Sequence, residues 1–188
     1  EAIFLTQGFV YPSAEAAEAR FLNQSDDEFI YARYGNPTTR MFEDRMASVE
    51  GTEDAFACAS GMAAINGALC ALVKAGDHIV AARQMFGSCL HVLRVLEGFG
   101  VAVTLVDGTK LDEWRAAMRP ETRVCFFESV SNPGLEVIDM AGVAEIAHAG
   151  GAVVLVDNAF ASPIFSRAVE LGVDIVVYSA TKHIDGGG

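Results

Sequence analysis

Lys182 is the residue whose type and position most directly suggest chemistry. It follows an apolar segment, 174–178, and lies among the hydroxyl side chains of Ser179 and Thr181. A lysine that is partly desolvated at the end of a buried strand favours Schiff-base chemistry with a carbonyl compound. An exposed loop lysine is the alternative interpretation, and the residue taken alone does not separate the two.

Asp157 also points to chemistry, because it ends an entirely apolar segment, 153–156. A carboxylate in such a place needs a cation or several hydrogen-bond donors to offset its loss of water. A protonated pyridine nitrogen is one such cation. The alternative interpretation is that Asp157 caps the segment that follows.

The run Ser60-Gly61-Met62 predicts a helix that begins with a serine cap and a glycine. The first N–H groups of a helix, together with its dipole, form an anion site, although an ordinary helix start is the alternative interpretation. The nucleotide motifs GxxxxGKS/T and GxGxxG are both absent from the sequence. Together these residues could bind one molecule: Asp157 a ring nitrogen, the hydroxyls and the helix start a phosphate, and Lys182 an aldehyde. The set therefore predicts a pyridoxal 5′-phosphate site.

Alternating apolar and helix-forming segments must position these residues. Short apolar runs predict strands at 54–59, 78–82, 101–106, 123–128, 152–157 and 174–179. Helix-forming patterns fall at 13–20, 39–49, 61–74, 87–99, 110–118, 140–149 and 163–171. Strands whose apolar residues are continuous are typical of a parallel sheet buried on both faces. The pattern predicts an α/β, doubly wound, parallel sheet with helices on both faces, whose ligands bind beyond the carboxyl ends of the strands.

Composition and charge narrow the class of protein. The 13 basic and 25 acidic residues give a net charge of −12, and 52% of the 188 residues are hydrophobic. The apolar fraction excludes intrinsic disorder, and no apolar run is long enough for a membrane helix. The acidic balance argues against nucleic acid or an anionic membrane as a partner. The four cysteines have no metal-binding spacing, so no metal is expected, and they are interpreted as reduced thiols of a cytoplasmic protein without a signal peptide.

Segments spread along the whole chain carry a resemblance to a known family. They are 31–38, 59–64, 75–78, 128–133, 156–158 and 178–183. On these motifs the chain resembles the Cys/Met-metabolism pyridoxal-phosphate enzymes. This transsulfuration group includes cystathionine γ-synthase, the cystathionine lyases and the homoserine-ester sulfhydrylases. Within the group, segments 4–11 and 83–88 look most like the O-succinylhomoserine sulfhydrylases.

The resemblance implies roles around the cofactor ring. Lys182 is implied to be the catalytic residue that binds the cofactor aldehyde, and Asp157 to pair with the pyridine nitrogen. Asn132 is implied to contact the cofactor near its ring oxygen. Phe86 takes the place of a tyrosine that many relatives stack on the ring, so a proton transfer by that hydroxyl is lost and Lys182 must carry more of it.

The resemblance also implies which residues hold the cofactor phosphate. Within one subunit they are the hydroxyls of Ser179 and Thr181 and the backbone N–H groups of Gly61 and Met62. Tyr31 and Arg33 are implied to reach the phosphate in a neighbouring subunit. Active sites shared between subunits, in a homotetramer built from dimers, are therefore expected.

The fold implied by the resemblance is fold type I of the pyridoxal-phosphate-dependent transferases, like the large domain of aspartate aminotransferase. Residues 1–35 are implied to form an N-terminal arm that contributes to a neighbouring subunit, and residues 36–188 an incomplete cofactor-binding large domain. Family members continue past the lysine motif. A smaller C-terminal domain, and the arginine that binds the substrate carboxylate, are therefore expected to be absent from this chain.

The activity implied by the resemblance is γ-replacement on an activated homoserine ester, with O-succinylhomoserine and sulfide giving homocysteine and succinate in methionine biosynthesis. Cystathionine γ-synthase or a cystathionine γ- or β-lyase is the alternative activity. A cofactor-free fragment or interaction module is the non-enzymatic alternative. Small-molecule substrates and further copies of the chain are the expected partners.

Overall fold

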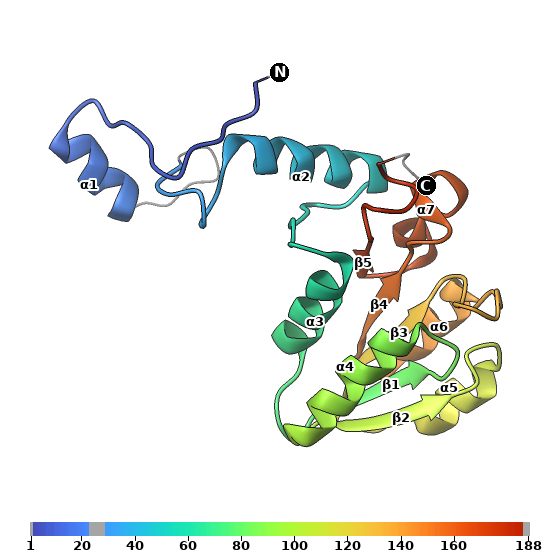
Figure 1. The fold of residues 1–188 in the computed structure, drawn as a ribbon. Helices are drawn as coiled ribbons and strands as arrows, with labels where there is room; N and C mark the ends of the chain where they lie inside the picture. The colour runs from blue at the N-terminus through green and yellow to red at the C-terminus, as the bar shows by residue number, and fades with distance from the viewer. Residues whose placement is uncertain (1, 23–28, 186–188) are drawn as a thin grey trace. The chain divides into compact units, whose positions relative to one another are not determined.

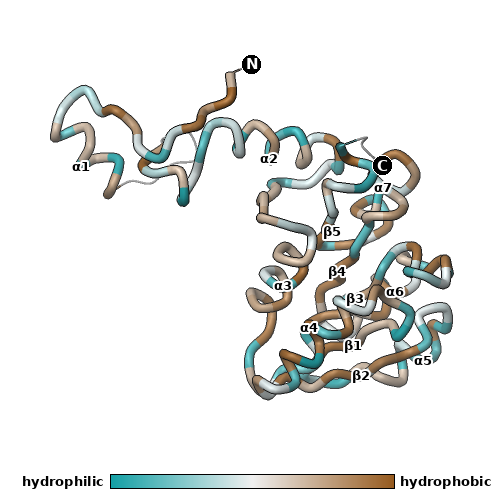
Figure 2. Tube along the Cα trace, in the orientation of Figure 1, coloured by the Kyte–Doolittle hydropathy of each residue, from teal (hydrophilic) through white to brown (hydrophobic). Residues whose placement is uncertain are grey.

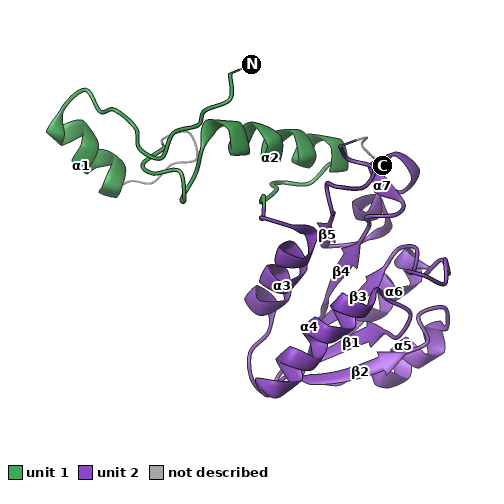
Figure 3. Cartoon of the chain, in the orientation of Figure 1, with its two compact units in different colours: residues 1–57 green, residues 58–188 purple. Residues whose placement is uncertain are grey.

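The computed structural model describes residues 2–22 and 29–185, and the chain divides into two compact units. Residues 1–57 form the first unit and residues 58–188 the second (Figure 3). No helix in the described residues is both long enough and apolar enough to span a lipid bilayer. The arm expected at 1–35 and the large domain expected at 36–188 stay predictions.

The first unit contains two helices, α1 (Ala14–Leu22) and α2 (Pro37–Glu50). The Asn36 side chain caps α2 by accepting the Thr38 N–H at 2.8 Å, as a short polar residue at a helix start does. The same side chain donates to the carbonyl oxygen of Phe4 at 3.0 Å, which ties the N-terminal segment to the helix. Both helices confirm the sequence prediction.

The strand expected at 54–59 is wrong, because this segment pairs with no strand among the described residues. Its backbone is bound by side chains instead. Glu43 Oε1 accepts the Ala57 N–H at 2.7 Å, and Asp54 Oδ1 accepts the Ala55 N–H at 2.8 Å. Apolar residues favour an extended chain, but a strand also needs a partner that matches its N–H and C=O groups.

Five parallel strands form the sheet of the second unit, in the order β2-β1-β3-β4-β5 (Figure 1). The strands are β1 (His78–Ala82), β2 (Ala102–Val106), β3 (Thr122–Glu128), β4 (Val153–Asp157) and β5 (Ile175–Val177). Apolar residues of the strands pack with those of the helices to form the core, and Figure 2 shows the strands as mostly hydrophobic. The structure therefore confirms the predicted parallel α/β sheet.

Helices cover both faces of this sheet, as the doubly wound pattern predicts (Figure 1). Helices α3 and α4 pack on one face, and α5 and α6 pack on the other. Their bounds are Gly61–Leu72, Gly87–Gly98, Leu111–Ala117 and Met140–Ala149. Each of these helices confirms a predicted one.

The single helix expected at 163–171 is wrong, because the chain forms two short pieces there. They are α7 (Ser162–Phe165) and the 3₁₀ helix η1 (Ala168–Leu171). Between them, the Ser166 carbonyl oxygen accepts the side-chain amide of Asn158 at 3.0 Å. This bond takes the acceptor that a continuous α-helix would use for its own backbone.

His78, at the amino end of β1, links three strands through its ring. Nδ1 lies 2.8 Å from Thr122 Oγ1 on β3, and Nε2 lies 2.9 Å from Thr104 Oγ1 on β2. The residue is 1% exposed. Burial, and then the positive charge of Arg119, lower the pKa of the ring, while the charge of Glu121 acts in the opposite direction. The neutral imidazole therefore joins β1 to β2 and β3 inside the sheet.

We expect acid to destabilise the protein through His78. Since its pKa is lower in the folded than in the unfolded chain, unfolding takes up a proton, so this stability is full above about pH 6.5 and falls below it. His78→Gln should flatten the change in unfolding free energy between about pH 7 and pH 5. His91→Gln, at an exposed position of α4, should keep the wild-type slope. Urea unfolding at each pH measures this, and equal slopes for wild type and H78Q would contradict it.

Candidate cofactor site

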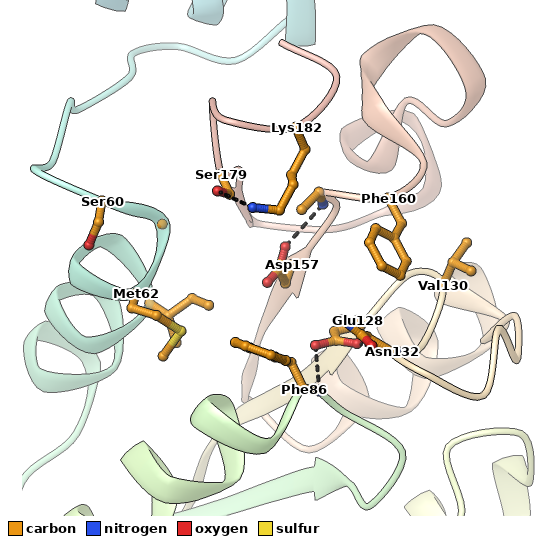
Figure 4. A pocket seen from close by; sticks show the side chains of 13 residues that line it. Ser60, Met62, Phe86, Glu128, Val130, Asn132, Asp157, Phe160, Ser179 and Lys182 are labelled. Carbon is orange, nitrogen blue, oxygen red and sulfur yellow. Dashed lines mark hydrogen bonds between the residues drawn. The ribbon is translucent and has the colours of Figure 1, made fainter. Parts of the chain in front are cut away.

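A cavity of about 250 Å³ lies at the carboxyl ends of the strands in the second unit (Figure 4). The predicted site residues that line it are Gly61, Met62, Phe86, Asn132, Asp157, Ser179 and Lys182. They come from the start of α3, the residue before α4, the loop after β3, the end of β4 and the chain after β5. Because the strands are parallel, their carboxyl ends bring these distant segments to one edge.

The start of α3 and the chain after β5 meet at one end of the cavity. A Cβ placed on Gly61 would lie 2.9 Å from Ser179 Cβ, so glycine is needed for this approach. Ser60 caps the helix by accepting the Ala63 N–H at 3.1 Å, and the preceding N–H groups are placed for an anion. The hydroxyls of Ser179 and Thr181 lie 3.0 Å apart. This end of the cavity therefore suits a phosphate.

Lys182 points to the same hydroxyl groups. Its Nζ donates to Thr181 Oγ1 at 2.9 Å and to Ser179 Oγ at 3.5 Å, and Figure 4 shows the second contact. Thr181 makes these contacts but is not among the residues that line the cavity. The predicted partial desolvation of Lys182 is wrong in this structure, because the residue is exposed. A chemical role for Lys182 is still supported by geometry, because the residue lines the cavity and two hydroxyl groups bind its amine.

Asp157 ends β4 inside the cavity. Its Oδ1 accepts the Ala159 N–H at 3.0 Å, so the capping interpretation holds for one oxygen. Burial raises the pKa of this carboxyl, while the Ala159 bond and the charge of Lys182 lower it. The raised pKa means that the surrounding donors do not fully offset burial. A cation in the cavity would favour the ionised carboxylate, and a pyridinium nitrogen is such a cation.

Glu128 also lines the cavity, although the sequence prediction gives it no role. It pairs with Asp157 in the register of β3 and β4, so the two acids stand side by side. Glu128 Oε1 accepts the Phe86 N–H and Oε2 accepts the Asn132 N–H, both at 2.7 Å. Burial raises the pKa of this carboxyl as well, and the charge of Asp157 adds to the rise. A signal exists in the sequence, because Glu128 ends an apolar run, 124–127, just as Asp157 ends its own.

Apolar residues that the sequence prediction does not name complete the lining. They are Ile65, Val130, Ala159 and Phe160. Nothing in their types separates them from residues of the core, so only the fold identifies them. They keep part of the cavity wall apolar, which strengthens electrostatic contacts to the two acids.

Cys89 completes a cluster of three acidic groups beside the cavity. One ligating atom of each of Cys89, Glu128 and Asp157 lies within 4.8 Å of the others, a spacing that a metal ion could bridge. Burial first, and then the charges of Asp157 and Glu128, raise the pKa of Cys89 to about 12. The thiol therefore stays protonated and donates to Glu128 Oε1, with 3.9 Å between sulfur and oxygen. A metal binds the thiolate form of cysteine, and the expected absence of a metal stays a prediction.

Tyr31 and Arg33 belong to the first unit, whereas the residues that line this cavity belong to the second. The Arg33 guanidinium lies 5.0 Å from the ring centre of Tyr31 and 5.4 Å from that of Tyr34. Stacking of this kind holds the guanidinium over aromatic faces. That Tyr31 and Arg33 reach the phosphate of a neighbouring subunit stays a prediction.

The sequence matches the family model of the Cys/Met metabolism PLP-dependent enzymes over residues 1–188. The chain belongs to this family. Its cofactor is therefore pyridoxal 5′-phosphate, as the sequence predicts.

Two kinds of curated relatives resemble this member of the family. It is 50% identical, over its whole length, to O-succinylhomoserine sulfhydrylase of Mycobacterium tuberculosis, and 44% identical to that of Pseudomonas aeruginosa. It is 41% identical, over 99% of its length, to L-methionine gamma-lyase of Fusobacterium nucleatum. The chain spans 46%, 47% and 47% of these relatives, which is less than half of each.

A solved structure from Campylobacter jejuni has the same fold, with a TM-score of 0.92 and 31% sequence identity. It is named as an O-acetylhomoserine (thiol)-lyase and was solved with N′-pyridoxyl-lysine-5′-monophosphate. The match covers 99% of this chain and 46% of that one. The likeness confirms the predicted fold class of the pyridoxal-phosphate-dependent enzymes.

The residues of the cavity fit pyridoxal 5′-phosphate on their own geometry. Asp157 supplies a partly buried carboxylate for a ring nitrogen, and a cation at this place would favour its ionised form. Gly61 and Ser179 approach so closely that helix N–H groups and a hydroxyl meet at the other end. Lys182 places an amine beside that hydroxyl, within the same cavity.

We expect Gly61→Ala to weaken cofactor binding, because the new Cβ would push Ser179 and the start of α3 apart. The expected loss of affinity is roughly tenfold, within the range of about 1–3 kcal/mol that overpacking costs. Gly67→Ala in the same helix is the control, since nothing lies within 4 Å of its Cβ, and alanine favours a helix over glycine. Titration of pyridoxal 5′-phosphate into each protein measures this. Equal affinities for G61A and wild type would show that the close approach is not needed.

Proposed function

We propose that the protein carrying this chain converts O-succinylhomoserine and sulfide to homocysteine and succinate by γ-replacement. The observation that carries the proposal is the 50% identity, across the whole chain, to the M. tuberculosis O-succinylhomoserine sulfhydrylase. The cavity lined by Lys182 and Asp157 supports the proposal. Its side chains offer an amine for an aldehyde, a carboxylate for a protonated ring nitrogen, and hydrogen-bond donors for a phosphate. The product is a precursor of methionine, which places the reaction in sulfur amino-acid metabolism.

Lys182 and Asp157 divide the proton chemistry between them in this proposal. Pyridoxal 5′-phosphate, when bound, supplies an aldehyde for amino groups and a ring that takes up electrons released at the substrate α-carbon. Asp157 holds the proton on the ring nitrogen. Lys182 would bind the aldehyde and, as a free amine, would move protons between the α- and β-carbons of the substrate. The hydroxyls of Ser179 and Thr181 orient its Nζ.

Phe86 favours an ester substrate over a thioether. Its side chain is 44% exposed at the cavity wall and offers an aromatic face without a hydroxyl. Succinate leaves as a stable carboxylate and needs no proton, whereas a thiol leaves from a thioether readily only when an acid protonates it. A site without a tyrosine hydroxyl at this position therefore suits the loss of succinate.

γ-Elimination is the second candidate activity. Relatives named L-methionine gamma-lyase from F. nucleatum and Porphyromonas gingivalis are 41% and 42% identical to this chain. The same lysine and aspartate would serve that reaction, so only the substrate and the products distinguish the two. Cystathionine γ-synthase and cystathionine lyase activity are separated in the same way, by supplying cysteine or cystathionine.

The proposed enzyme is a homotetramer built from dimers that share their active sites. Tyr31 and Arg33 would then lie at the cofactor phosphate of the neighbouring subunit. A guanidinium is suited to a bidentate contact with phosphate. Such a contact would supply positive charge to an anionic cofactor that the acidic chain as a whole repels.

We expect the wild-type protein, supplied with O-succinylhomoserine and sulfide, to release homocysteine and succinate in equal amounts. Lys182→Ala should lower kcat by about a thousandfold or more with the fold retained, because the amine that moves the protons is gone. Lys74→Ala, at an exposed position outside the cavity, should keep the wild-type rate. Borohydride reduction of the wild type should leave a pyridoxyl mass on Lys182.

Other products would overturn parts of this proposal. A higher kcat/KM for methionine, with release of methanethiol, ammonia and 2-oxobutanoate, would favour elimination. A folded, cofactor-supplied preparation without a borohydride adduct would favour the non-enzymatic alternative. Turnover of K182A at the wild-type rate would rule out the lysine assignment.

We expect Asp157→Asn to weaken cofactor binding and to lower kcat on the order of 100-fold, the size seen when a preorganised electrostatic contact is lost. The amide keeps the shape of the side chain but cannot offset a positive charge on the ring nitrogen. Asp112→Asn is the control, because that side chain is 98% exposed on α5. Cofactor titration and steady-state kinetics measure both effects. Normal kinetics in D157N would count against the pairing with the ring nitrogen.

A further inference from the structure

One buried carboxylate connects two separate walls of the cavity. Glu128 ends β3 and is 5% exposed. Oε1 accepts the backbone N–H of Phe86 and Oε2 accepts that of Asn132, each at 2.7 Å. Figure 4 shows the carboxylate between the side chains of these two residues, at the foot of the cavity.

Other contacts also hold the two segments that carry these N–H donors: the Phe86 carbonyl oxygen accepts the Cys89 N–H at 2.8 Å, and the Glu136 carbonyl oxygen accepts the Ser131 N–H at 2.9 Å. Phe86 is the N-cap residue of α4, and its side chain makes no capping hydrogen bond to the helix. Asn132 lies in the loop after β3. Both side chains line the cavity, one with an aromatic ring and one with an amide. The Glu128 carboxylate accepts from both segments, and it thereby joins them to each other.

An acid at this position needs a physical reason, because burial of a carboxylate is unfavourable unless donors surround it. Glu128 has three donors: the N–H groups of Phe86 and Asn132, and the thiol of Cys89 at 3.9 Å. A carboxylate is a side chain of this size that can accept on both of its oxygens at once. The N–H groups of Phe86 and Asn132 come from different walls of the cavity, so a side chain that binds both must accept on two atoms.

We propose that Glu128 is a positioning residue, whose carboxylate sets the separation of Phe86 and Asn132 and thereby the width of the slot that receives the cofactor ring. The proposal rests on the proposed function, since it concerns the same cavity. Glu128 holds the two backbones, whereas the side chains of Phe86 and Asn132 would face the cofactor in the cavity that they line. A wider slot would weaken stacking by Phe86 without removing Lys182 or Asp157.

Two substitutions remove the two contacts in steps. Glu128→Gln keeps the volume and one carbonyl acceptor, but its NH₂ group faces the second N–H donor, so one of the two contacts is lost. Glu128→Ala removes both contacts. Glu136→Gln is the matched control, because it changes an exposed acid on the same loop that does not line the cavity.

The experiment measures backbone amide exchange and cofactor binding in the purified holoenzyme and after removal of the cofactor. We expect the Phe86 and Asn132 amides to exchange at least about tenfold faster in E128A, and one of the two to do so in E128Q, as amides do when they lose a charged acceptor. The amide of Val80, in the centre of the sheet, should not change. Pyridoxal 5′-phosphate should bind roughly 10- to 100-fold more weakly, with a shifted absorbance maximum of the bound cofactor. E136Q should match the wild type in every readout.

Three outcomes decide the proposal. Wild-type protection of both amides in E128A would show that the Glu128 contacts do not fix the positions of Phe86 and Asn132. Faster exchange with unchanged affinity and absorbance would show that the contacts are structural only. Failure of the wild type itself to bind the cofactor would refute the proposed function together with this role, whereas normal binding by both the wild type and E128Q would refute the positioning role alone. If E128A does not fold, E128Q gives the same decision.

Discussion

Two carboxylates at neighbouring strand ends, Glu128 buried and Asp157 partly buried, constrain the rest of the cavity. Glu128 and Asp157 are partners in the register of β3 and β4, and burial raises the pKa of both. The surroundings offset that burial in different ways. Glu128 receives two backbone N–H groups, which fixes the start of α4 and the loop after β3. Asp157 receives one N–H, so a cationic ring nitrogen in the cavity would favour its ionised form.

Much of the fold is predictable because the strands of a parallel sheet carry their signal locally. The run 153–156 is apolar throughout and forms β4, as predicted. Each error involves a side chain outside the segment concerned, although Asp54 also binds the backbone within the first segment. Glu43 binds the backbone of the strand expected at 54–59, and Asn158 interrupts the helix expected at 163–171. Neither partner can be found from the composition of the segment that it changes, because each contact depends on the folded chain.

The candidate site is predictable where a residue type is unusual for its surroundings. Asp157 is an acid after an apolar strand, and the structure places it in the cavity. Glu128 meets the same criterion, but its contacts run to the backbones of Phe86 and Asn132, which are distant in sequence or in a loop and carry no local signal for this contact. The exposure of Lys182 is likewise a property of the fold, since the same sequence is compatible with a buried or an open loop.

The cavity has opposite polarity at its two ends, and this polarity can orient a cofactor that carries a cationic nitrogen and an anionic phosphate. Glu128 and Asp157 form the acidic end, while the helix start at Gly61, the Ser179 hydroxyl and Lys182 form the donor end. In a chain of net charge −12, a phosphate gains nothing from the overall field and depends on local donors. A reversed cofactor would place its phosphate against two carboxylates, where like charges repel by several kcal/mol. The acids that favour a ring nitrogen therefore also disfavour the reversed orientation of the cofactor. The donors at the phosphate end then need to provide binding affinity, but they do not need to determine which way round the cofactor binds.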